Sequence, residues 1–168
     1  MHIETLRLIL RQPELKDVDD YLDFINSEFV LKYNAMSVTT REKLMDRFSA
    51  PDQGIFVLQR KDTGKVIGEI HIQEDSLRYG VASKELSYHL AEQHARKGYM
   101  KEAMNAIIEH LFKTENIECL SARCFSENRA SLALLKSLGF EQNGCVPRCV
   151  KGYGGIVYDD VLHTLLRK

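Results

Sequence analysis

A short basic stretch ahead of a long apolar pattern is the first place where this sequence could do chemistry. Arg96 and Lys97 stand directly before Gly98, and apolar residues then recur at three- and four-residue spacing from Met100 to Leu111, as in an amphipathic helix. The first N–H groups of a helix have no partner inside it and carry a partial positive charge, so an anion is stabilised there. A glycine lets a pyrophosphate approach the backbone. The stretch is a candidate phosphate loop, or else the solvated lead-in to a buried helix.

A second stretch, SENRASLALLKSLGFEQNG, pairs an amide with a hydroxyl at the start of another expected helix. Asn128 and Ser131 are three residues apart, which places them on one face of that helix. Either Asn128 or Ser126 can cap the helix by accepting a hydrogen bond from a free backbone N–H. Taken alone, the asparagine is a cap and the serine an ordinary polar position.

The strand-like stretch KELSYHL carries the favoured candidate for a general base. Alternation places Glu85 on one face with Ser87 and His89, and the intervening residues on the other face. A carboxylate beside an apolar cleft can have its pKa raised toward neutrality, which suits proton abstraction. The alternative is an ordinary strand carboxylate that faces solvent.

Glu69 and His71 in GEIHI form a competing acid–base pair. They also share one face of an expected strand, and histidine titrates near neutral pH. A single histidine in a strand is more often structural, so this pair ranks behind Glu85.

Periodicity predicts the elements that would position these residues. Thr39 and Glu42 form a capping-box pattern that begins a helix after an earlier acidic helix. Asp62-Thr63-Gly64 joins two alternating segments as a hairpin. The predicted helices lie near 15–26, after Thr39, after Gly98 and at 127–140, and the predicted strands at 3–11, 54–61, 66–73, 84–90, 117–125, near 140–149 and at 156–166.

A crossover helix between the strands at 84–90 and 117–125 predicts a parallel pair with right-handed connection. The helix N-terminus then opens at the carboxyl edge of the first strand. Ligands of open α/β sheets bind at that edge, so the sheet topology favours the phosphate interpretation of the basic stretch.

Composition limits the functional classes. The 168 residues fit one domain, 1–168, with 44% apolar and 28% charged residues and a formal charge of −1, which argues against disorder and against a nucleic-acid partner. No apolar run approaches the roughly 20 residues of a membrane span, and the N-terminus lacks the order of a signal peptide. We therefore expect a cytoplasmic protein without a membrane partner. Its four cysteines form no Cys-x-x-Cys pair, so we expect no metal site.

Together these stretches resemble the GNAT superfamily of N-acetyltransferases, in the branch of the RimJ/RimL-type ribosomal-protein alanine acetyltransferases. The resemblance rests on TLRLILRQPELKDVDDY, KVIGEIHI, KELSYHLAEQHARKGYMKEAM, ENRASLALLKSLGFEQNG and YDDVLHTLL. It implies an α/β (α+β) GNAT fold, with a mixed, mostly antiparallel sheet of six to seven strands, a parallel strand-helix-strand crossover and helices on both faces.

The same resemblance implies acetyl-CoA as donor and a primary amine as acceptor, with direct transfer in a ternary complex. Glu85 stands at the position of the branch's strand glutamate, Ser131 at that of the donor to the leaving thiolate, and Asn128 at a contact to the pantetheine arm. The backbone N–H of Leu90 or Ala91 is the expected donor to the thioester oxygen.

The expected pyrophosphate loop departs from the family pattern. Its six positions, usually Gln/Arg-x-x-Gly-x-Gly/Ala, are here Ala95, Arg96, Lys97, Gly98, Tyr99 and Met100. Main-chain N–H groups and the two cations can still hold a pyrophosphate, whereas Met100 would narrow the cleft. A second hypothesis is therefore a catalytically weak or inactive acyl-CoA-binding or interaction module of the same fold.

The acceptor is open at this point. A protein N-terminus, an antibiotic amine and a polyamine all bring a cation, and the carboxylates of Glu69 and Glu85 would suit each of them. A monomer and a homodimer both fit the sequence.

Overall fold

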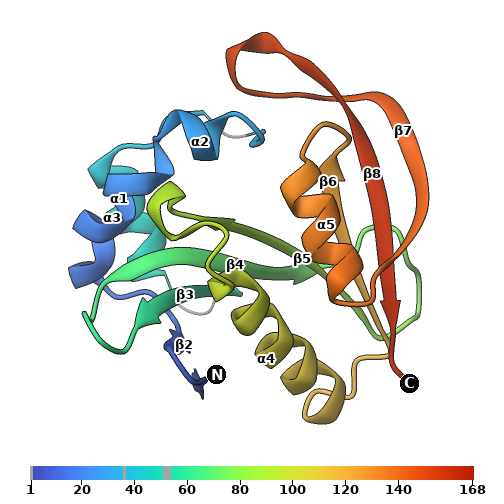
Figure 1. Ribbon diagram of the computed structural model, residues 1–168, viewed down its shortest axis with the longest axis horizontal. Coiled ribbons are helices and arrows are strands. Elements are labelled where there is room, and N and C mark those ends of the chain that lie inside the picture. The colour runs from blue at the N-terminus through green and yellow to red at the C-terminus, as the bar shows by residue number, and fades with distance from the viewer. Residues whose placement is uncertain (1, 36, 51–53) are drawn as a thin grey trace.

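The alternating segments pair into one mixed sheet. The computed structural model describes residues 2–35, 37–50 and 54–168, and within them the sheet has eight strands in the order β1-β2-β3-β4-β5-β6-β8-β7, rather than the expected six to seven. All neighbours are antiparallel except β5 and β6, which are parallel. The strands are β1 (His2–Glu4), β2 (Leu8–Arg11), β3 (Ile55–Arg60), β4 (Val66–Glu74), β5 (Ser83–Leu90), β6 (Cys119–Phe125), β7 (Glu141–Lys151) and β8 (Val157–Leu166) (Figure 1).

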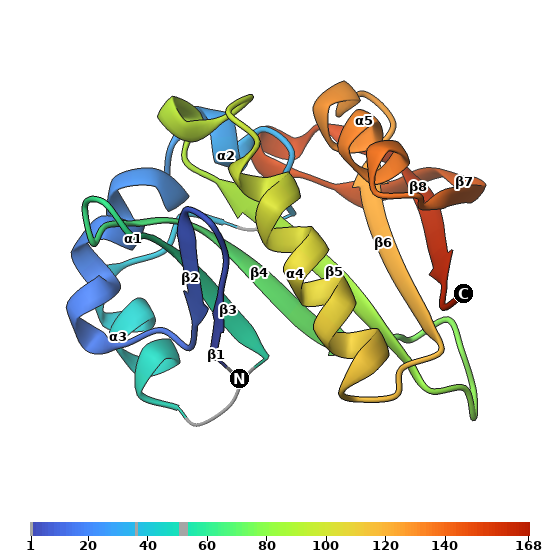
Figure 2. The same ribbon diagram turned by 60° about the horizontal axis from the view of Figure 1, so that its bottom comes forward.

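Helices cover both faces of the sheet. One hydrophobic cluster joins the apolar faces of α4 and α5 to β2 through β6, and a second joins α1, α2 and α3 to the opposite side of β3 and β4. In β3, Phe56 and Leu58 belong to the first cluster and Val57 to the second, so this strand is buried on both faces. Figure 2 shows α4 lying diagonally across the sheet. The helices are α1 (Val18–Ile25), α2 (Glu28–Leu31), α3 (Arg41–Ser49), α4 (Tyr99–Lys113) and α5 (Arg129–Ser137).

The N-terminal segment departs from the single strand expected at 3–11. It forms a hairpin of β1 and β2, in which the Thr5 hydroxyl accepts a hydrogen bond from the Leu8 N–H at 3.0 Å. Alternation continues through the turn, so the pattern alone did not reveal the break.

The start of α3 lies one residue later than the capping box predicted. Thr40, not Thr39, accepts the capping hydrogen bond from the Lys43 N–H. The Asn26 side chain holds Thr39 outside the helix, because it accepts from the Thr39 N–H at 2.9 Å and donates to the Thr39 carbonyl at 3.0 Å. The short α2 was not predicted, since four residues show no helical period.

The sheet parts in its middle. The parallel ladder between β5 and β6 runs only from Ser83 opposite Cys119 to Leu86 opposite Ala122. Beyond that point β5 stays paired with β4 as far as Leu90, and β6 stays paired with β8. The crossover through α4 therefore returns to a strand that diverges from β5, as Figure 1 shows.

Candidate functional site

The turn before α4 has the backbone conformation of an anion-binding loop. Gly98 precedes the helix with φ of +80°, in the left-handed region that other residues rarely adopt. The first hydrogen bond within the helix runs from the Glu102 N–H to the Gly98 carbonyl. The N–H groups of Tyr99, Met100 and Lys101 precede it, so they have no acceptor inside the helix. The loop thus presents a set of backbone donors at the positive end of the helix dipole.

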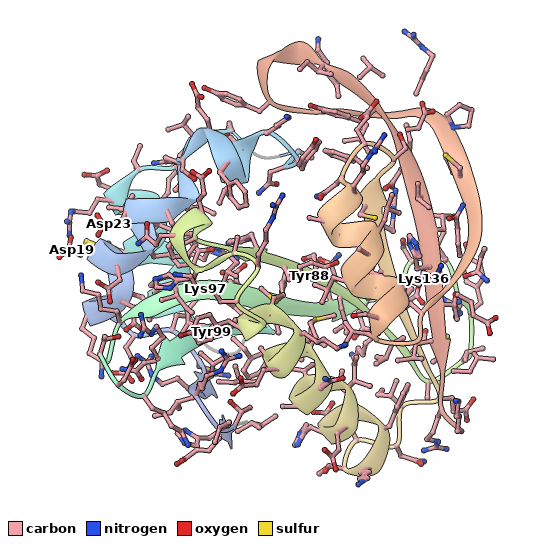
Figure 3. The ribbon with its side chains drawn as sticks, viewed as in Figure 1. Asp19, Asp23, Tyr88, Lys97, Tyr99 and Lys136 are labelled. Carbon is pink, nitrogen blue, oxygen red and sulfur yellow. The ribbon has the colours of Figure 1, made fainter. Side chains whose placement is uncertain are left out.

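The side chains of the loop separate by role. Arg96 and Lys97 are exposed, and Figure 3 shows Lys97 in the turn ahead of Tyr99. Ala95 is half-buried. Met100 was expected to narrow the cleft, but its side chain packs in the hydrophobic cluster under α4 and is 7% exposed. The larger side chain at this position is therefore accommodated in the hydrophobic core.

Arg7 was not among the residues predicted from the sequence, and it binds this loop from the β1–β2 turn. Its Nη1 donates to the Lys97 carbonyl at 2.9 Å and its Nε donates to Glu102 Oε2 at 2.7 Å. Its guanidinium also lies 4.2 Å from the centre of the Tyr99 ring. Burial works to raise the pKa of Glu102, but hydrogen bonds from Thr5 and Arg7 outweigh it and hold that pKa below its usual value. The loop is thus fixed by an ionised carboxylate and a cation.

Backbone donors also face the gap where β5 leaves β6. The Ala91 N–H, one of the two expected donors to a thioester oxygen, is not available, because it donates to the Ile67 carbonyl at 2.8 Å. Hydrogen bonds along an antiparallel strand point alternately to its two sides. The N–H groups of Leu90 and Tyr88 are therefore directed away from β4, toward the side that β6 has left. Of the expected pair, only Leu90 is suitably directed.

The second expected motif meets β5 across this gap. Asn128 Oδ1 caps α5 by accepting from the Ser131 N–H at 3.1 Å, which decides the cap in favour of Asn128 over Ser126. The Ser131 hydroxyl lies 2.5 Å from the Tyr88 hydroxyl, and burial raises the pKa of Tyr88 well above its usual value. Figure 3 shows Tyr88 between β5 and α5. A partly buried pair of hydroxyls thus connects the two sides of the parted sheet.

Glu85 lies on the opposite face of β5 and is 8% exposed. Burial raises its pKa above the usual value, while a hydrogen bond from Gln73 Nε2 at 3.0 Å and the charge of Arg123 work against that rise. A carboxylate with a raised pKa is closer to neutrality and is a better base than an exposed one.

The competing pair of Glu69 and His71 lies in β4, where Glu69 is held by two other elements. Glu69 Oε2 accepts from the Tyr21 hydroxyl at 2.5 Å, and its Oε1 accepts from Arg47 Nη2 at 2.9 Å. Burial works to raise the pKa of Glu69, but His89 in its protonated form, the charge of Arg47 and the hydrogen bonds from Tyr21 and Arg47 lower it overall. The cross-strand neighbour of Glu69 is His89, whereas His71 lies opposite Ser87. Glu69 is therefore an ionised, fully engaged carboxylate.

A cavity of about 190 Å³ opens on the same face as Glu85. Its lining includes Arg78, Arg123 and Ser121, and Ser121 lies opposite Glu85 in the parallel ladder. The Ser121 side chain is buried. This cavity offers polar groups next to Glu85.

Residues 2–35, 37–50 and 54–168 form neither a metal centre nor a membrane-spanning helix. No three His, Cys, Asp or Glu side chains in those ranges cluster so as to hold a metal ion. No helix formed by these residues is long and apolar enough to cross a bilayer.

Known acetyltransferase sequences are similar to this chain over most of its length. A family model described as an acetyltransferase (GNAT) domain matches residues 7–141. The uncharacterized N-acetyltransferase YnaD of Bacillus subtilis (strain 168) is 27% identical over 171 residues, which span 100% of this chain and 98% of YnaD.

Solved structures share the fold. A GNAT-family acetyltransferase from Bacillus anthracis has a TM-score of 0.88 at 23% identity, over 99% of this chain and 98% of that one. The ribosomal-protein-S5-alanine acetyltransferase of Vibrio fischeri has a TM-score of 0.86 at 20% identity, over 99% and 96%. MccE, a microcin C7 self-immunity acetyltransferase in complex with acetyl-CoA and AMP, has a TM-score of 0.81 at 18% identity, over 96% and 93%.

Proposed function

Since the chain belongs to the GNAT acetyltransferase family, we propose that this N-acetyltransferase moves an acetyl group from acetyl-CoA directly to a primary amine in a ternary complex. The observation that carries the proposal is the parted sheet. The gap between β5 and β6 and the donor-rich N-terminus of α4 lie at the same edge, and a coenzyme needs both, one for its acyl arm and one for its pyrophosphate.

The α4 turn is the proposed pyrophosphate site. Backbone N–H groups from Tyr99 to Lys101 would donate to the phosphate oxygens, and Arg96 and Lys97 would add charge from exposed positions. Because the donors belong to the main chain, the side-chain departures at Ala95 and Met100 leave them in place. The presence of acetyl-CoA in the MccE structure, which has the same fold, supports this assignment.

Two groups across the gap are proposed to stabilise the acyl transfer. The Leu90 N–H is directed to where a thioester oxygen gains charge, as an oxyanion donor must be. Ser131, hydrogen-bonded to Tyr88 at 2.5 Å, would donate a proton to the departing thiolate. Asn128 fixes Ser131 by capping α5 and retains its amide Nδ2 to contact the pantetheine arm.

The acceptor is proposed to approach over the opposite face of β5. Glu85 would attract the ammonium group and take its first proton, since its raised pKa makes it an effective base. The adjoining cavity, with Arg78, Arg123 and Ser121, would hold the part of the acceptor next to the amine. Both a protein N-terminus and a small-molecule amine fit this chemistry.

Calorimetry with acetyl-CoA tests the coenzyme site first. We expect binding of acetyl-CoA and desulfo-CoA but not of ATP, because ATP lacks the pantetheine arm that the gap accepts. A panel of amines and peptide N-termini, followed by thiol release, then tests transfer. Binding without thiol release for any acceptor would favour the non-catalytic acyl-CoA-binding module, which the departures at Ala95 and Met100 suggest.

Glu85→Gln tests the proposed base. The amide keeps the shape and the hydrogen bond with Gln73 but cannot take a proton, so we expect turnover to fall about 100-fold or more while the Kd for acetyl-CoA stays unchanged. Equal turnover of the variant and the wild type from pH 6 to 9 would remove Glu85 from the mechanism.

A further inference from the structure

The far end of β5 carries a histidine level with the gap in the sheet. The side chains of Tyr88 and Leu90 pack with the α4–α5 cluster, and their N–H groups are directed toward the gap. His89 between them therefore projects to the other face, from which the acceptor is proposed to arrive. Four residues separate it from Glu85, or roughly 13 Å of strand. His89 is thus much nearer than Glu85 to the proposed oxyanion donor at Leu90.

A buried network holds the imidazole. His89 Nε2 lies 2.9 Å from the Tyr21 hydroxyl, which donates to Glu69 at 2.5 Å and accepts from Arg47 Nη1 at 3.0 Å. The Tyr21 ring contacts the His89 ring edge-on at 5.8 Å between centroids. Tyr21 and Glu69 are 0% and 3% exposed, so the network excludes water from this side of the imidazole.

The hydrogen bonds fix which nitrogen carries the proton. Tyr21 has a single hydroxyl proton, and that proton goes to the ionised Glu69. The hydroxyl oxygen must therefore accept from His89, so Nε2 bears the hydrogen. In the neutral ring, Nδ1 then keeps a free lone pair. His89 as a whole residue is half-buried.

Burial, more than the surrounding charges, favours the neutral form of the ring. Burial lowers the pKa of His89 below its usual value, and Arg47 from α3 and His71 from β4 act in the same direction. Glu69, also from β4, opposes them. From α1 the ring meets the uncharged Tyr21 and the apolar Phe24. A neutral imidazole with an available lone pair is a general base.

We propose that His89, through Nδ1, takes the second proton from the acceptor nitrogen as its bond to the acyl carbon forms. The proposal rests on the acetyltransferase function above and assigns a base that the family resemblance did not supply. Arg47, Tyr21 and Glu69 are positioning residues, because they act through the imidazole and do not touch the substrate.

The proton balance requires two acceptors. An ammonium group enters with three protons and leaves as an amide with one. Glu85 takes the first proton where the amine enters, before the amine moves along β5 to the thioester carbon, and this frees the lone pair that attacks that carbon. His89 takes the second as the C–N bond forms, and the C–S bond then breaks with its electrons on sulfur. Ser131 gives its hydroxyl proton to that thiolate and is reprotonated from solvent. Glu85 and His89 release their two protons to solvent, so the net reaction releases one proton per acetyl group transferred.

His89→Gln is the principal test. The glutamine amide can still donate to Tyr21 but offers no basic lone pair, so we expect kcat to fall about 100-fold or more. Its Kd for acetyl-CoA should stay within twofold of the wild type. The wild-type kcat should fall on acidification with an imidazole inflection, and the variant should lack it. His2→Gln, a change at an exposed histidine of β1, is the matched control and should keep full activity.

A second variant, His89→Ala, distinguishes the loss of a base from a disturbance of packing. Imidazole added to His89→Ala should restore part of the lost turnover if a base is missing, and none if only structure is lost. Wild-type kcat with an unchanged pH profile in His89→Gln, or no rescue of His89→Ala, overturns the role of His89 and leaves the acetyltransferase function standing. A wild type that binds acetyl-CoA but acetylates no amine overturns both.

Discussion

At the residue scale, the two faces of β5 divide the proposed chemistry. Tyr88 and Leu90 face the coenzyme side, and Glu85 and His89 face the acceptor side. Adjacent residues of a strand point to opposite faces, so a single strand can place a proton donor and proton acceptors on either side of one reacting carbon. The groups that donate a proton during the reaction are therefore separated from the groups that accept one.

The paired hydroxyls of Ser131 and Tyr88 lead to a prediction at this scale. Ser131→Ala should lower kcat by about 10- to 100-fold, because the thiolate loses its nearest proton donor. Tyr88→Phe should lower kcat by less, because Ser131 remains and loses only its partner. Stopped-flow measurement of thiol release with saturating acetyl-CoA checks both. A larger loss in the tyrosine variant would reverse the order of the two donors.

At the element scale, the β1–β2 hairpin and α4 act as one unit. Arg7 in the hairpin turn accounts for the contact, since it binds the Lys97 carbonyl and Glu102 and stacks on Tyr99. The C=O and N–H of one trans peptide point in opposite directions. By holding the Lys97 carbonyl, Arg7 therefore also fixes the direction of the Gly98 N–H on the far side of that peptide.

Arg7→Gln tests this coupling. We expect acetyl-CoA to bind about tenfold more weakly, because one charge-assisted contact to the loop is worth roughly 1.5 kcal/mol, while kcat at saturation stays near the wild-type value. Calorimetry gives the Kd and thermal unfolding gives the stability. Arg60→Gln is a suitable control, since that guanidinium also lies near Tyr99, at 5.7 Å, without binding the loop carbonyl. If Arg7→Gln and Arg60→Gln weaken acetyl-CoA binding equally, the effect of Arg7 comes from its charge and not from its contact with the loop carbonyl.

At the scale of the whole molecule, Glu69 ties α1, α3, β4 and β5 together and links stability to pH. Its pKa in the folded protein lies below the ordinary 4.5. The carboxylate therefore stabilises the fold fully above pH 4.5, and this contribution is lost as the pH falls through the folded pKa. His89 adds a separate loss, since its lowered pKa makes charging the folded state costly as the pH falls below about 6.5.

Glu69→Gln isolates the carboxylate. At pH 7 the variant should be less stable by about 3 kcal/mol, because Arg47 and Tyr21 lose a buried ionic partner. The difference between the two proteins should shrink below pH 4.5, where the wild-type carboxyl is also being protonated. Urea unfolding at pH 7, 5 and 3.5 measures it. A difference that does not change over this range would mean that Glu69 acts through packing alone.

Much of the fold was predictable because local periodicity and the crossover rule are strong signals. The β3–β4 hairpin, the β5-α4-β6 unit and a cap of α5 by either Asn128 or Ser126 were predicted, because all three depend on neighbours in sequence. Arg7, the Tyr21–Glu69–His89 network and the engaged Ala91 N–H were not predictable, since each joins segments tens of residues apart. The predicted number of strands was lower than the observed eight, because the alternation of apolar and polar residues continues through the break between β1 and β2. The roles assigned to Glu85, Ser131 and the loop stay predictions.

The separation of β5 from β6 has a consequence for the dynamics of the backbone. It creates a strand edge inside the molecule, where the amides of Tyr88 and Leu90 lack the neighbouring strand that protects other amides of the sheet. An extended ligand with its own amide groups can pair with such an edge, as in β-strand addition. Amide hydrogen exchange at these two residues should be fast in the free protein and should slow when coenzyme binds. The coenzyme would then complete the sheet as well as carry the acetyl group.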